Sequence, residues 1–149
     1  MANINPEILK VFGFWGSILV LKMLAMIPLT ARQRFRKQVF ANPGDVTMLK
    51  NSVPKGKVVY DDPDVERVRR AHLNDLENIV PWFIITYIWL CTEPSIVLAK
   101  VLIRTFVLSR IVHTLSYAVM PQQPLRAISF FVGFGILGFE ALTSLLHYS

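Results

Sequence analysis

The stretch ERVRRAHLNDLENIVP, residues 66–81, places arginines, a histidine, asparagines and carboxylates directly before a long apolar segment. If this stretch is helical, Arg70, Asn74 and Glu77 lie at i, i+4 and i+7 and share one face. Arg69 and His72 then lie about one turn apart on an adjacent strip. A single helix therefore offers cationic, anionic and amide groups at the edge of an apolar segment.

The composition indicates a membrane protein. Of the 149 residues, 53% are hydrophobic, and the mean hydropathy is +0.45, which are high values for a soluble domain. Four segments approach the roughly 20 residues that cross a bilayer as a helix: about 8–29, 71–90, 95–119 and 127–146. We predict an all-α fold in which residues 1–149 form one membrane domain, an integral four-helix bundle. The first apolar run is expected to remain as a span, because it leads to no small-residue cleavage site.

The positive charge of the chain is concentrated in one loop, predicted at residues 30–70. The formal net charge is +6, and ten of the 16 Lys and Arg residues lie between Thr30 and Arg70. Because basic residues collect on cytoplasmic loops, we predict that this loop and the Pro121–Arg126 turn face the cytoplasm, with both termini on the opposite side. The sequence contains no recognisable nucleic-acid module, so the basic charge does not indicate nucleic-acid binding.

Local signals mark where the predicted helices begin and end. Asn5-Pro6-Glu7 is typical of a helix start, and the acids at 61–64 supply capping groups before the second span. The turn at 92–94 is very short, which predicts that the second and third spans are antiparallel neighbours. The proline-containing turn Met120–Arg126 ends the third span and places Arg126 at the start of the fourth.

Glycines within the spans predict close helix packing. Gly13 and Gly16 lie in the first span, and Gly133, Gly135 and Gly138 form a glycine-rich face in the fourth.

Several ionisable residues lie inside the predicted spans, where a charge is costly and marks either a structural pair or a functional site. Lys22 interrupts the first span, and Glu140 in the fourth is its preferred partner. Arg110 lies well inside the third span, and we interpret it as a functional-site residue. A structural ion pair of Arg110 with Glu77 or Glu140 is the alternative.

Most other polar groups converge on the predicted cytoplasmic ends of the spans. Arginine forks bind carboxylates and an acid binds an ammonium group, so this set suits a small peptide-like ligand that carries both. The set comprises Arg69, Arg70, His72, Asn74, Glu77, Arg110, Tyr117 and Arg126, with Arg34 at the end of the first span.

The sequence does not favour catalysis by a nucleophile or a metal of the protein itself. No serine lies at helical spacing from a base, and the single cysteine, Cys91, excludes an internal disulfide and a multi-cysteine metal site. His72, Asp75 and Glu77 do not form a recurrent ligand pattern either. If the chain is an enzyme, we expect its ligand to bring the nucleophile. A thiol, whose pKa is about 8.5, needs cationic or hydrogen-bonding groups to ionise, and Arg126 or Tyr117 can supply them.

Four motifs resemble the microsomal glutathione transferase 1 branch of the MAPEG family. They are ERVRRAHLNDLENIVP at 66–81, QVFANP at 38–43, SRIVHTLSY at 109–117 and LRAISFFVG at 125–133, and the resemblance covers nearly the whole chain. It implies a four-helix membrane protomer that assembles as a homotrimer, with glutathione bound between subunits near the cytosolic face. It also implies residence in the endoplasmic reticulum membrane, with the mitochondrial outer membrane as a second location.

The resemblance further implies an activity: conjugation of the glutathione thiolate to hydrophobic electrophiles and reduction of lipid hydroperoxides, without a metal. Arg126 and Tyr117 would act on the thiolate, and Glu77 would hold the α-ammonium group. The implied glutathione contacts are Arg34, Arg69, Arg70, His72, Glu77 and Tyr117, with Asn74 and Arg110 as additions.

One departure from the family pattern affects regulation. Vertebrate members of this branch carry a cysteine just after the FANP motif, where modification activates the enzyme, whereas this chain has Asp45-Val46. Thiol-triggered activation at this position is therefore not expected. Three other interpretations remain: a non-catalytic lipid-binding scaffold of the same family, a glutathione-dependent eicosanoid synthase and, as the weakest because no internal repeat is present, a transporter.

Overall fold

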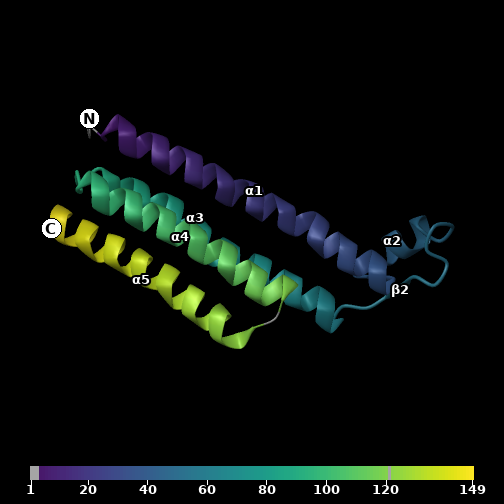
Figure 1. Cartoon of the computed structure of the whole chain (residues 1–149). Helices are drawn as coiled ribbons and strands as arrows, with labels where there is room; N and C mark the ends of the chain where they lie inside the picture. The colour runs from purple at the N-terminus through teal and green to yellow at the C-terminus, as the bar shows by residue number, and fades with distance from the viewer. Residues whose placement is uncertain (1–3, 121) are drawn as a thin grey trace.

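A computed structural model describes residues 4–120 and 122–149, and four long helices form its body (Figure 1). They are α1 (Pro6–Lys37), α3 (Pro63–Leu90), α4 (Ile96–Thr114) and α5 (Gln123–Tyr148). A five-residue π-helix, η1 (Leu115–Val119), extends α4. The short helix α2 (Pro43–Met48) and the strands β1 (Val39–Phe40) and β2 (Lys57–Val58), which pair in parallel, lie in the first loop. The predicted all-α class is confirmed, apart from this small strand pair.

The two ends of the bundle differ. The end that carries residues 38–62, η1 and the start of α5 is called the loop end here. The opposite end, called the termini end, carries both chain termini and the turn between α3 and α4 (Figure 1).

Side-chain caps fix the helix starts as predicted. The Asn5 carboxamide oxygen accepts from the Glu7 amide at 2.8 Å, and Asp62 Oδ1 accepts from the amides of Asp64 and Val65 at 3.1 and 3.2 Å. These bonds satisfy backbone donors that have no partner within the helix. Proline follows each of these two caps, at a position where its missing N–H costs nothing.

The helices extend further than the sequence predicts, so the loop is shorter than residues 30–70. α1 continues to Lys37, and the basic side chains of its last turn stabilise this end through the helix dipole, which is negative there. α3 already begins at Pro63. α5 begins at Gln123 rather than after Arg126, because Pro124 is compatible with the first helical turn. Arg126 therefore lies on the first turn of α5, not in a connecting turn.

The arrangement of α3 and α4 differs from the prediction. The two helices are consecutive and antiparallel, yet they lie diagonally across the bundle, and α1 and α5 each pack against both of them. Large aromatic rings fill the centre between the diagonal pair: Trp82 of α3 stacks on Phe106 of α4 with ring centroids 4.9 Å apart. The antiparallel direction is confirmed, but the two helices meet through side chains across the centre rather than as adjacent helices, because a short turn fixes direction and not which faces meet.

Small residues allow the closer contacts between adjacent helices. A Cβ on Gly16 of α1 would lie 2.8 Å from Phe83 of α3, and one on Gly133 of α5 would lie 3.2 Å from Ser109 Oγ of α4. Gly13, Gly135 and Gly138 have open space beside them. Close packing within the protomer is therefore confirmed for two of the five predicted glycines.

Two of the predicted spans, α1 and α5, are long and apolar enough to cross a membrane. Within the described residues, α1 and α5 contain 18-residue windows of mean hydropathy 1.8 and 1.7, and only 17% and 28% of those windows are buried in the protomer. Their apolar side chains thus face outward, as expected in lipid. α4 carries Lys100, Arg104 and Arg110 within its 19 residues, which lowers its hydropathy.

Candidate functional site

A cleft of about 570 Å³ opens at the loop end between α3, η1 and α5. Its lining combines cations, carboxylates and amides with aromatic side chains, which suits a polar ligand of mixed charge. The lining residues are Tyr60, Asp61, Pro63, Glu66, Arg67, Arg70, Ser116, Tyr117, Gln122, Gln123 and Arg126. Of the site residues predicted from the sequence, the cleft brings together Arg70, Tyr117 and Arg126.

Arg126 is held in a defined position in this cleft. Its guanidinium carbon lies 4.8 Å from the centre of the Tyr117 ring, and Nη2 donates to Gln123 Oε1 at 2.6 Å. The ring face attracts the cation and orients its planar fork. The side chain is half-buried, so its N–H groups face both the protein and the cleft. A fixed, partly desolvated cation is suited to stabilising an anion.

The π-helix η1 separates the cleft residues from the interior of the bundle. The Met120 amide donates to the Leu115 carbonyl at 2.8 Å, which is the i to i+5 bond that widens the turn. Arg110 and Thr114, which precede η1, are buried, whereas Tyr117 within η1 lines the cleft. Insertions of this kind are frequent at functional sites because they redirect side chains at a helix end.

The polar residues that were predicted to line one side of α3 lie partly on the surface of the protomer and partly in its interior. Arg69 is exposed and its Nη1 bonds Glu66 at 2.5 Å. Glu77 is exposed, and it lies in an apolar strip on the outside of the protomer. The strip is formed by Leu73, Leu76 and Val80, whose exposed fractions are 55%, 42% and 46%.

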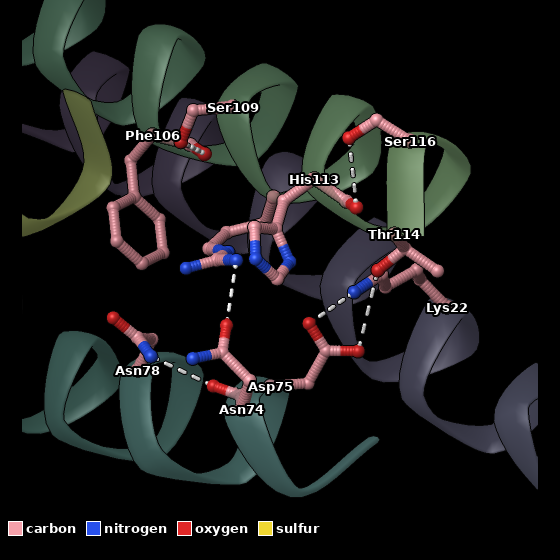
Figure 2. A network of polar contacts seen from close by, with 10 residues as sticks. Lys22, Asn74, Asp75, Asn78, Phe106, Ser109, His113, Thr114 and Ser116 are labelled. Carbon is pink, nitrogen blue, oxygen red and sulfur yellow. Dashed lines mark hydrogen bonds and ion pairs between the residues drawn. The ribbon is translucent and has the colours of Figure 1, made fainter. Parts of the chain in front are cut away.

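Between the helices lies a buried polar network, shown in Figure 2. Asp75 of α3 is fully buried and forms an ion pair with Lys22 of α1. Asp75 Oδ2 also accepts from Thr114 Oγ1 of α4 at 3.4 Å. Arg110 Nη2 donates to the Asn74 carboxamide oxygen at 3.0 Å. The network thus ties three helices together below the cleft.

These contacts correct the predicted ion pairs. Lys22 pairs with Asp75, and Glu140 instead accepts a 2.7 Å hydrogen bond from Thr86 of α3. The Lys22–Glu140 pair is impossible in this fold because α1 and α5 occupy opposite corners of the bundle. Arg110 bonds an amide, so its alternative pairing with Glu77 or Glu140 is also wrong.

Six residues of the predicted site do not line the cleft: Arg34, Arg69, His72, Asn74, Glu77 and Arg110. Asn74 and Arg110 bond each other, while Arg34 and His72 are half-buried at the loop end of α1 and α3. The sequence reasoning missed Glu66, Arg67 and Gln123 as cleft residues. For Glu66 and Arg67 the sequence did indicate a place near Arg70, because the three residues lie at i, i+1 and i+4, on one side of a helix.

No group of three or more His, Cys, Asp and Glu side chains that could hold a metal ion occurs in residues 4–120 and 122–149.

Comparison with known proteins places the chain among membrane proteins. The sequence profile of the MAPEG family matches residues 12–146. Microsomal glutathione S-transferase 1 of Mus musculus is 42% identical over 132 residues, which is 89% of this chain and 85% of the relative. The Homo sapiens protein of the same name is 41% identical over the same shares. Prostaglandin E synthase of Bos taurus is 34% identical over 128 residues, 85% of this chain and 80% of the relative.

Proposed function

The chain belongs to the MAPEG family of membrane proteins, and we propose that it is a membrane-bound glutathione transferase. In the proposed reaction the glutathione sulfur forms a bond to an electrophilic carbon of a hydrophobic substrate, and the leaving group departs. With a lipid hydroperoxide, two glutathione molecules become the disulfide while the hydroperoxide is reduced to alcohol and water. The similarity to the two microsomal glutathione S-transferase 1 sequences supports this choice.

The observation that carries the proposal is the placement of Arg126 over Tyr117 in the cleft between α3, η1 and α5. The thiolate is the reactive form of glutathione, and a nearby cation favours it over the thiol. Arg126 supplies the cation, and the Tyr117 hydroxyl is available as a hydrogen-bond donor. Rate enhancement then comes from proximity and from stabilisation of an anion rather than from proton transfer by the protein.

The remaining contacts bind the two ends of glutathione. Arg70 in the cleft, with Arg34 and Arg69 nearby at the loop end, binds the carboxylates through charge-assisted hydrogen bonds. Glu77 holds the α-ammonium group, and His72 contributes to the same wall. Asn74 and Arg110 act from the interior, because their mutual hydrogen bond fixes α3 relative to α4.

We further propose that a neighbouring subunit completes the site in a homotrimer. The exposed Glu77 lies in an apolar strip where a carboxylate facing hydrocarbon is unfavourable. A second protomer packed on this strip removes the carboxylate from lipid and brings the cations of another α1 towards it. In this arrangement the loop end faces the cytosol in the endoplasmic reticulum membrane, and hydrophobic substrates enter from the bilayer.

An absorbance experiment tests the role of Arg126. Glutathione thiolate absorbs in the ultraviolet, so binding to the wild-type protein is expected to give a difference signal that Arg126→Ala loses while glutathione still binds. Arg126→Lys is the matched control: it keeps a positive charge without the planar fork and should retain part of the signal. An unchanged thiolate signal in Arg126→Ala would refute the assignment.

A turnover assay separates the proposed activity from its alternatives. Purified protein is supplied with glutathione and either a chlorinated nitrobenzene or a lipid hydroperoxide, and turnover of both is expected. Glutathione binding without turnover of either would favour a non-catalytic lipid-binding scaffold. The similarity to prostaglandin E synthase favours an eicosanoid synthase as the second candidate, and it predicts glutathione-dependent formation of prostaglandin E instead.

A further inference from the structure

Arg104 lies on the outer surface of α4, within an apolar strip that runs along the helix. The arginine is exposed, and Val97, Val101 and Leu108 on the same face have exposed fractions of 74%, 51% and 51%. These positions follow one another at helical spacings of three and four residues, so they form one continuous stripe. None of the ion pairs found within residues 4–120 and 122–149 includes Arg104.

The depth of Arg104 requires an anionic partner. It lies eight residues after Ile96, the first residue of α4, which is about 12 Å along the helix axis. The hydrocarbon core of a bilayer is about 30 Å thick, so the Arg104 backbone lies well inside it. A cation at this depth is unfavourable unless it reaches an anion or water.

The direction of the side chain selects the nearer interface. Side chains on a helix tilt towards its N-terminus, and α4 begins at the termini end of the bundle. The guanidinium of Arg104 is therefore directed along Val101 and Val97 towards the headgroups of the leaflet at that end. An arginine side chain spans enough of the remaining depth to draw a headgroup phosphate towards it.

The carboxylates of Glu7 and Glu77 are poor candidates for the partner. Glu7 lies at the same end of the bundle, but it accepts a 2.5 Å hydrogen bond from Lys100. Lys100 lies one turn before Arg104 on α4. Glu77 of another copy lies 13 residues from the end of α3, about 20 Å from the termini end. Its side chain tilts towards the loop end, away from the direction of Arg104. The two charges thus differ in depth and diverge.

We propose that Arg104 binds the phosphate of a phospholipid in the leaflet at the termini end, and that an acyl chain of this lipid packs along Val97, Val101 and Leu108. The planar fork of arginine suits bidentate phosphate contacts. The apolar side chains on either side of it supply the surface for hydrocarbon. This lipid lies at the opposite end of the bundle from the cleft, so the site is independent of the proposed glutathione chemistry.

Native mass spectrometry of detergent-purified protein tests the site. Wild-type protein should retain a phospholipid that Arg104→Gln binds about tenfold or more weakly, since a charge-assisted contact is lost. Arg104→Lys should retain the lipid partly. Lys10→Gln, which removes another exposed cation from the same end of the bundle, is the matched control and should retain it fully. Equal retention in wild type and Arg104→Gln would overturn the proposal.

Two further measurements distinguish the source of the anion. Titration of delipidated protein with phosphatidylglycerol in detergent should raise the melting temperature of the wild type but not of Arg104→Gln, and inorganic phosphate should have no such effect. Stabilisation by inorganic phosphate equal to that by the lipid would overturn the assignment to a phospholipid. A lower oligomeric state of Arg104→Gln with unchanged lipid retention would also overturn it, because a carboxylate of a second copy would then be the partner.

Discussion

At the scale of single residues, the buried carboxylate of Asp75 is important for the free energy of unfolding. It is completely buried, and its partner Lys22 is only 12% exposed. Because the attraction of such a pair offsets the cost of removing both charges from water, loss of one partner leaves an uncompensated charge in the interior.

We expect Asp75→Asn to lower the free energy of unfolding by about 3–5 kcal/mol, because Lys22 remains buried and charged without its counter-ion. Thermal unfolding in detergent, followed by circular dichroism, measures the loss. The double variant Lys22→Met with Asp75→Leu removes both charges of the pair and should recover part of the stability, because buried Arg110 then lacks the nearby negative charge of Asp75. A double variant as unstable as the single one would contradict this explanation.

The residue types of the candidate site could be predicted from the sequence, but most of their partners could not. Charged side chains inside apolar spans are rare, so Lys22, Arg110 and Glu140 were identifiable from their positions in the sequence. The partner of Lys22 was not, because Asp75, Glu77 and Glu140 were all chemically suitable. Only the positions of the helices in the bundle decide among the three.

At the scale of elements, the contact between α1 and α3 depends on Gly16. The ring of Phe83, which faces this glycine, also packs against Phe12 and Trp82, with centroids 6.0 and 5.0 Å away. The ring is half-buried and lines a groove along α1, so a displacement of the ring disturbs these two aromatic contacts.

We expect Gly16→Ala to destabilise the protein by about 1 kcal/mol, because its new methyl group would displace the half-buried ring of Phe83 from its aromatic neighbours. Gly13→Ala is the matched control one turn away. Open space surrounds Gly13, and alanine is the better helix former, so its melting temperature should stay the same or rise. Equal changes in melting temperature for the two substitutions would show that the contact between Gly16 and Phe83 does not contribute to stability.

The loop end of α1 is joined to the start of α3 by an ion pair. Lys37 Nζ lies 2.6 Å from Asp64 Oδ2, and Arg67 also contacts this carboxylate. The hydrogen bond from Lys37, together with the charges of Lys37 and Arg67, lowers the pKa of Asp64 below its ordinary value of 3.8.

Because the folded-state pKa of Asp64 is lowered, its contribution to stability is complete above the unfolded value and is lost as the pH falls through the folded value. We expect the wild type to be more stable than Asp64→Asn at neutral pH, and the difference to shrink below about pH 4. Melting temperatures of both proteins, recorded from neutral pH to below about pH 4, measure this difference in stability. Lys37→Met should reduce the same pH dependence, and an unchanged difference at low pH would contradict the assignment.

The capping groups at two helix starts were predictable from the sequence, whereas the other helix ends and the helix neighbours were not. The caps at Asn5 and Asp62 follow from local hydrogen bonding, which the sequence specifies directly. The diagonal placement of α3 and α4 depends instead on the fit of Trp82 against Phe106 across the centre. Such packing involves residues far apart in the sequence, so the short turn between the helices does not determine it.

At the scale of the whole molecule, the cleft of one protomer accounts for only part of the predicted site. Arg70, Tyr117 and Arg126 line it, whereas Arg34 and Glu77 lie elsewhere on the protomer. The proposed trimer explains this separation if the cleft of one subunit is completed by Arg34 of its neighbour.

A mixing experiment tests this arrangement. Arg34→Ala and Arg126→Ala are each expected to reduce glutathione conjugation strongly when present alone. When the two variants are coexpressed in equal amounts, about a quarter of the interfaces in a cyclic oligomer combine an intact Arg34 with an intact Arg126. Activity should then rise well above that of either variant. Activity equal to the mean of the two variants would show that both arginines act within one subunit.

The diagonal placement of α3 and α4 also bears on how the chain enters the membrane during synthesis. Lys22, Asp75 and Arg110 leave the ribosome in that order, and each later residue meets polar partners on helices already made. The three cations of α4 are costly for insertion of an isolated segment, but Asn74 is already in place for Arg110. The Lys22–Asp75 ion pair and the Arg110–Asn74 hydrogen bond thus involve only helices that precede α5 in the chain.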